Sequence, residues 1–78
     1  MSEKYEHKIV KHIAVLGEKS AGWTTEVNLV SWYGHEPKID VRDWAPDHER
    51  MSKGTVLSYE AAQKLQEALA EYFREARL

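Results

Sequence analysis

Aromatic and basic side chains gather in the middle of the chain, at spacings that suit contact with a single-stranded nucleic acid. They are Trp32, Lys38, Arg42, Trp44 and Lys53, with Tyr33 beside the first. Bases stack on aromatic rings at roughly 1–3 kcal/mol each, while Lys and Arg side chains neutralise phosphates. A competing interpretation places the tryptophans in the core or a dimer interface and the cations on a solvated face balanced by Asp40. The pattern alone leaves both interpretations open.

Other titratable residues form weaker patterns. Asp47, His48 and Glu49 follow one another, and imidazole and carboxylate groups suit divalent ions or acid–base chemistry. Their polar surroundings favour a solvated loop instead. His7 and His12 stand five residues apart, so on a regular strand they point to opposite faces and cannot share an ion.

The signatures of common enzyme classes do not occur in the sequence. It has no P-loop, no Gly-x-Gly-x-x-Gly, no Gly-x-Ser-x-Gly and no His-Glu-x-x-His motif. We therefore expect no catalysis, no cofactor and no metal site.

Length and composition indicate one small domain. The 78 residues, with 42% hydrophobic content, suit a single domain over residues 1–78. The chain has no Cys, which fits a reducing cytoplasm, and no apolar run approaches the roughly 20 residues that cross a bilayer. Because the net charge is only −2, a charged partner must be met by a local patch.

Four β-branched and aromatic stretches, separated by turn-forming connections, predict four strands. Their expected ranges are 5–16, 23–33, 38–44 and 53–57, the first with room for a bulge. In the third stretch, Ile39 and Val41 alternate with the charged and aromatic residues and so share one face. Short links between these stretches favour antiparallel pairing.

A helix is expected after Ser58, which is a natural N-cap. Apolar residues then recur at helical spacing: they are Ala61, Leu65, Leu69, Tyr72, Phe73 and Ala76. The order predicts an α+β fold, ββββα, with an antiparallel sheet followed by one helix. One helix covers one face of a sheet, so the other face is left for solvent, a second copy or a ligand. Because the core is small and the helical stripe broad, we expect a homodimer.

Several segments, taken in order, resemble the transcriptional coactivator family called positive cofactor four. The main ones are Lys38-Ile39-Asp40-Val41-Arg42-Asp43-Trp44, a polar loop, and Lys53-Gly54-Thr55-Val56-Leu57-Ser58 before the helix. Residues 22–23, 28–32, 36–38 and 44–49 are similar to its short bacterial branch, typified by YdbC. The likeness spans nearly the whole chain.

This resemblance implies a strongly curved sheet backed by one helix, in a homodimer that binds single-stranded DNA along its β-surfaces, largely without sequence preference. By position, it makes Arg42 the basic residue of the family's Ile-Asp-Ile-Arg run, Trp44 the aromatic two residues beyond it, and Lys53 part of a Lys-Gly pair opening the last strand. Trp32 falls near a family aromatic. Eukaryotic members carry more lysines where this chain has residues 34–37, and a Ser-rich regulatory tail.

We therefore expect a cytoplasmic homodimer that binds single-stranded DNA in transcription regulation or in replication and repair. The expected contact residues are Trp32, Lys38, Arg42, Trp44 and Lys53. RNA binding is an alternative, because stacking and phosphate contacts do not distinguish the sugar. The other alternative is a protein-interaction module that uses the same face.

Overall fold

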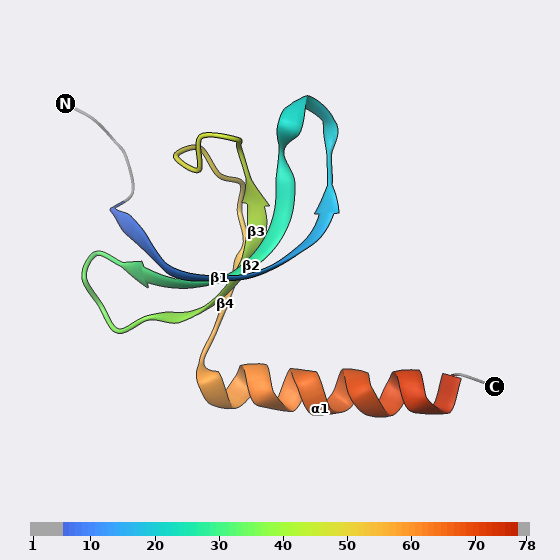
Figure 1. Ribbon diagram of the computed structural model, residues 1–78. Helices are drawn as coiled ribbons and strands as arrows, with labels where there is room; N and C mark the ends of the chain where they lie inside the picture. Colours follow the sequence, from blue (N-terminus) through green and yellow to red (C-terminus); the bar gives the residue numbers. More distant parts are fainter. Residues whose placement is uncertain (1–5, 77–78) are drawn as a thin grey trace.

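Four antiparallel strands and one helix make up the computed structural model, which describes residues 6–76 (Figure 1). The elements are β1 (His7–Glu18), the 3-10 turn η1 (Ser20–Gly22), β2 (Thr24–Trp32), β3 (Lys38–Trp44), β4 (Thr55–Leu57) and α1 (Tyr59–Ala76). The strands lie in the order β1-β2-β3-β4, each paired with its neighbour in sequence. The ββββα fold expected from the sequence is confirmed.

The strand limits follow the hydrophobic pattern closely in the middle of the sheet and less closely at its ends. β3 has the expected limits, whereas β4 begins two residues later than predicted. β1 runs two residues further than expected, and residue 5, where it was predicted to begin, lies outside the described residues. The limits are predicted best where apolar and polar residues alternate regularly, as in β3, and β1 lacks such regular alternation.

β1 is bulged three times against β2. The register shifts between Ile9 and Lys11, between His12 and Ala14, and between Val15 and Gly17. Each shift leaves one residue of β1 without a direct partner: these are Val10, Ile13 and Leu16. A bulge bends its strand and increases the local twist, so three in succession curl β1 around the rest of the sheet (Figure 1).

The bulges also correct one expectation. His7 pairs with Trp32 and His12 with Asn28, and these two β2 residues lie an even number of positions apart. Both histidines therefore point to the same face, so the prediction that they face opposite ways is wrong. The physical reason is the extra residue at Val10, which shifts the alternation by one position.

The sheet has two unlike faces. The inner face carries residues that are buried: Glu26, Asn28, Val30, Asp40 and Trp44. The outer face carries apolar residues that are only half-buried: Val27, Leu29, Ile39, Val41 and Leu57. The predicted alternation of β3 is confirmed, but the more buried side is the one that bears the charged residues.

The loop between β3 and β4, residues 45–54, causes this burial by folding back over the inner face. Ala45 N–H donates to the carbonyl of Arg50 at 3.0 Å, and Met51 forms a β-bridge with Trp44. Ala45 has no solvent exposure, like Val30 and Trp44. The core of one chain is therefore small and lies under this loop.

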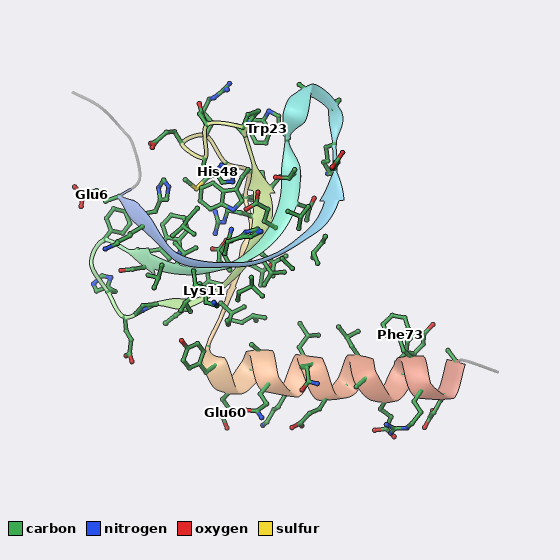
Figure 2. All side chains as sticks on the ribbon, viewed as in Figure 1. Glu6, Lys11, Trp23, His48, Glu60 and Phe73 are labelled. Atoms are coloured by element: carbon green, nitrogen blue, oxygen red, sulfur yellow. The ribbon has the colours of Figure 1, made fainter. Side chains whose placement is uncertain are left out.

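The helix begins as predicted, with Ser58 Oγ accepting a hydrogen bond from Ala61 N–H at 3.1 Å. It starts beside β3 and β4 and then extends away from the sheet (Figure 2). No described residue of α1 is buried, and Leu65 and Leu69 are each 46% exposed. Within one chain, the helix therefore does not cover either face. No helix in residues 6–76 is both long and apolar enough to cross a bilayer.

Candidate nucleic-acid interface

Arg42 is held on the inner face by the carboxylate two residues before it. Its Nε and Nη2 donate to the two oxygens of Asp40, at 2.7 and 2.8 Å, and its Nη1 donates to the carbonyl of Ser52 at 3.1 Å. The guanidinium carbon also lies 4.7 Å from the centre of the Trp32 ring. Asp40 has no solvent exposure and the Arg42 side chain only 11%, so this ion pair is fixed and largely desolvated.

An open pocket of about 420 Å³ lies beside this pair, within the range of small-ligand sites. Its walls come from the end of β2, from β3, and from the chain that leads into β4. The residues that give it chemical character are Trp32, Tyr33, Arg42, Ser52, Lys53 and Val56. Tyr33 is 52% exposed and Lys53 is exposed, so a ring and a cation flank the pinned guanidinium.

The close approach of residue 54 to β3 shapes the pocket. A Cβ at Gly54 would clash with the Arg42 side chain and lie 2.5 Å from the carbonyl oxygen of Val41. Only glycine leaves room for the backbone there. The Lys-Gly pair seen in the sequence thus places Lys53 at the pocket while Gly54 lets the chain pack against Arg42.

Trp44 lies under the loop and does not reach the pocket. Its ring has no solvent exposure and is packed between two histidines, with centroid distances of 5.1 Å to His7 and 5.8 Å to His48. The indole nitrogen is buried, and among the described residues it has no hydrogen-bond partner. The ring is therefore not open to a base in this structure.

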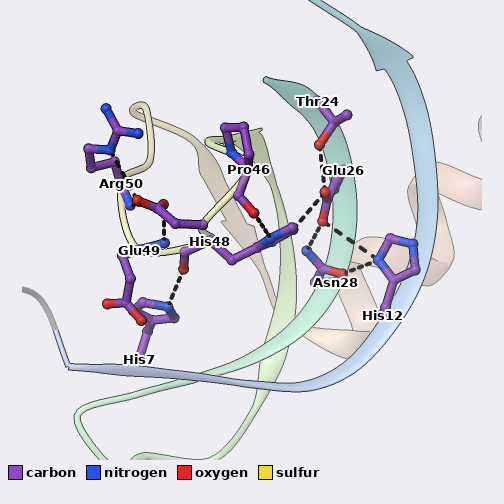
Figure 3. A network of polar contacts seen from close by, with 10 residues as sticks. His7, His12, Thr24, Glu26, Asn28, Pro46, His48, Glu49 and Arg50 are labelled. Carbon is purple, nitrogen blue, oxygen red and sulfur yellow. Dashed lines mark hydrogen bonds and ion pairs between the residues drawn. The ribbon is translucent and has the colours of Figure 1, made fainter. Parts of the chain in front are cut away.

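A polar network ties the loop to β1 and β2 (Figure 3). At its centre is Glu26, which is 3% exposed and accepts hydrogen bonds from Thr24 at 2.6 Å and Asn28 at 3.0 Å. His48 Nε2 lies 2.9 Å from Glu26 Oε2, the oxygen that also accepts from Thr24, and His12 Nδ1 lies 2.8 Å from the Asn28 amide oxygen. The loop is anchored at His48 by these contacts.

Burial by itself raises the pKa of Glu26, because a carboxylate loses hydration. The hydrogen bonds from Thr24, Asn28 and His48, with the charge of His48, outweigh that effect and hold the pKa of Glu26 below 4.5. The ionised carboxylate is thus the form that the fold stabilises.

Three of the five predicted site residues come together: Trp32, Arg42 and Lys53 all line the pocket. Lys38 is exposed at the start of β3, and neither it nor Trp44 is part of the pocket wall. Asp47 and its neighbours form a loop turn, in which Asp47 Oδ1 accepts from the N–H groups of Glu49 and Arg50. Residues 6–76 contain no cluster of three or more metal-ligating side chains.

Sequence reasoning missed the contribution of Ser52 and the role of Glu26. The Ser52 carbonyl fixes Arg42, a backbone contact that no side-chain pattern reveals. Glu26 is a charged residue on a strand, and only the loop that closes over it makes it buried. One signal could have found it: Trp32, Val30, Asn28 and Glu26 are each two positions apart on one strand, so their side chains share a face.

Two comparisons with known proteins bear on this arrangement. A family model described as Transcriptional Coactivator p15 (PC4) matches residues 19–68, which include the pocket and the first half of α1. An uncharacterized protein of Treponema pallidum (strain Nichols) is 29% identical over 58 residues, which cover 74% of this chain and 68% of that protein.

Proposed function

Because this chain belongs to the family of the transcriptional coactivator p15 (PC4), we propose that it binds single-stranded DNA at the pocket between Trp32, Arg42 and Lys53. The family is one of DNA-binding coactivators, and the resemblance found in the sequence is confirmed by the match. The observation that carries the proposal is the pocket itself, where aromatic and basic side chains meet within the matched residues. We propose that this binding serves transcription regulation, or the handling of single strands in replication and repair.

The pocket has the chemistry that such binding needs. Tyr33, half exposed at its rim, offers a ring face on which a base can stack. Lys53, exposed beside it, supplies a cation for a phosphate. Lys38, exposed at the start of β3, provides a second cation for a strand that continues along the sheet. No cofactor and no catalytic step enter this function.

We further propose a homodimer, in which the apolar surfaces left open by one chain are covered by a second copy. The outer face of the sheet is apolar and only half-buried. The helix adds a stripe of exposed large residues: Leu65, Leu69, Tyr72 and Phe73. A chain of this size gains stability by burying such surfaces, and most soluble oligomers are symmetric homodimers.

Titration of labelled oligo-dT, oligo-rU and duplex DNA at two salt concentrations tests the proposal. Oligo-dT should bind more tightly than duplex, with an affinity that falls as salt rises. Tighter binding of oligo-rU would instead assign the site to RNA. If none of the three binds, a protein-interaction module becomes the better interpretation of the same surface.

A further inference from the structure

The hydrogen bonds of Arg42 leave a defined part of its guanidinium unused. An arginine has five N–H donors. Among the described residues, Arg42 uses three of them: Nε and Nη2 toward Asp40, and Nη1 toward the Ser52 carbonyl. Because each terminal nitrogen carries two N–H groups, one N–H remains on Nη1 and one on Nη2. These two nitrogens form one end of the planar fork.

The charge of Arg42 is already matched. Asp40 is fully buried and bonded to it through both oxygens, so the pair as a whole is neutral. A phosphate placed here would bring a second negative charge close to the Asp40 carboxylate, whereas Lys53 in the same pocket is an exposed cation. Lys53 is therefore the better phosphate contact, and a neutral acceptor is the better ligand for the two free donors of Arg42.

The surroundings restrict how a ligand reaches Arg42. Trp32 lies over the guanidinium at 4.7 Å, and only 11% of the side chain is exposed. A stacked base on that side is excluded by the indole. Arg42, which lines the pocket, thus keeps one unused N–H on each terminal nitrogen, and its other contacts fix the plane of the guanidinium.

We propose that Arg42 reads one nucleobase, by donating its two remaining N–H groups to two adjacent acceptors on the base. This inference rests on the proposed single-strand binding and adds a base preference at one position of the bound strand. Guanine offers such a pair in O6 and N7, the commonest specific partner of arginine, whereas adenine pairs an acceptor with a donor and thymine has a lone O4 beside a methyl group on that edge. Cytosine offers O2 and N3 on its Watson–Crick edge, which a single strand leaves open.

The test uses a short oligo-dT with one central base replaced by dG, dC, dA or 7-deaza-dG. We expect the dG or the dC oligonucleotide to bind about 5- to 150-fold more tightly than the dA one, the equivalent of about 1–3 kcal/mol. If guanine is the base read, 7-deaza-dG should lose the gain, because it lacks the N7 acceptor but keeps the size and stacking surface of a purine. A dC preference would assign reading to the Watson–Crick edge.

Arg42→Lys supplies the matched variant, since it keeps a cation for Asp40 but lacks the planar fork. In this variant the ratio between the affinities for the dG or dC oligonucleotide and for the dA oligonucleotide should fall to about one, whatever its affinity for plain oligo-dT. Retention of the preference by Arg42→Lys would overturn the inference. Equal binding of all the oligonucleotides by the unmodified protein would do so without any variant, even if Arg42→Lys fails to fold. In either case binding of plain oligo-dT shows that the proposed function stands, whereas its absence would overturn both.

Discussion

Asp40, which has no solvent exposure, accepts hydrogen bonds from Arg42 through both of its carboxylate oxygens. The two residues lie two positions apart on β3, so they share the inner face of the sheet. Removing one partner of such a pair leaves a buried, uncompensated charge, which typically costs about 3–5 kcal/mol. The pair therefore has a structural as well as a binding role, and phosphate contacts are best tested at another cation.

Lys53→Ala should weaken oligo-dT binding and flatten the plot of log K against log salt by about 0.7 for each phosphate that the variant no longer neutralises. Lys53 is exposed at the pocket, so the fold should be unaffected. Lys64→Ala, which removes an exposed cation from α1, is the control and should leave the slope unchanged. Anisotropy titrations between about 50 and 200 mM salt measure both. Equal slopes for the two variants would place the phosphate-binding cations elsewhere.

Tyr33→Ala and Trp44→Ala should have opposite effects. Tyr33 is half exposed at the pocket, so its loss should weaken oligo-dT binding by about 1–3 kcal/mol and leave thermal unfolding nearly unchanged. Trp44 is fully buried, so its loss should lower the free energy of unfolding by about 3–5 kcal/mol. Denaturant unfolding followed by binding under native conditions separates the two. A stable Trp44→Ala protein that binds poorly would show that the ring contacts DNA.

Gly54→Ala should destabilise the protein by about 1–3 kcal/mol, because the added methyl group would meet the Val41 carbonyl and the Arg42 side chain. Gly17→Ala is the matched control in β1: a Cβ there has no atom within 4 Å. It should be neutral or slightly stabilising, since alanine restricts the unfolded chain more than glycine does. Urea midpoints compare the pair. Equal midpoints would mean that β4 shifts freely away from β3.

Acid should destabilise the protein in part through Glu26. A pKa below 4.5 in the folded state means that the carboxylate adds stability above pH 4.5, and that this contribution is lost as the pH falls through the folded pKa. Glu26→Gln should therefore melt at a lower temperature than the unmodified protein near pH 6. The difference in melting temperature should shrink as the pH falls below 4.5 and through the folded pKa of Glu26. The exposed Glu36→Gln, which makes the same change outside the buried network, serves as control and should melt near the temperature of the unmodified protein. A Glu26→Gln difference that stays constant with pH would contradict this linkage.

Sedimentation at micromolar concentration should give about twice the chain mass of 9.1 kDa, as expected for a homodimer. Leu69→Glu, in the exposed stripe of α1, should shift the protein toward monomer because it would bury a charge between the copies. Glu67→Gln, a change of charge on the same helix, should leave the mass unchanged. A monomer for the unmodified chain would remove the shared-surface proposal.

Local patterns in the sequence were sufficient to predict the strands and the helix. They were insufficient to predict which side chains the loop between β3 and β4 would bury. The alternation of β3 and the Ser58 cap were visible because each depends on residues a few positions apart. The burial of Trp44 depends on a contact with His7, which is far away in the sequence, and on the fold of the loop that brings His48 back over the ring. From the sequence alone, the charged face of β3 is expected to be exposed to solvent. In the structure, the loop of residues 45–54 covers this face and buries Asp40. Trp32, Arg42 and Lys53, which the sequence predicts as contact residues, line the pocket, whereas the backbone groups in its walls left no signal in the sequence.

The three bulges of β1 have a consequence beyond curvature. β1 is paired on one side only, so within one chain its other side carries N–H and C=O groups open to a neighbouring strand. Such exposed edges promote aggregation when they are long and flat. Here the ladder is broken at Val10, Ile13 and Leu16, so an incoming strand would find no continuous run of more than a few matched groups. The feature that bends the sheet thereby also protects a twelve-residue edge strand from pairing with other chains.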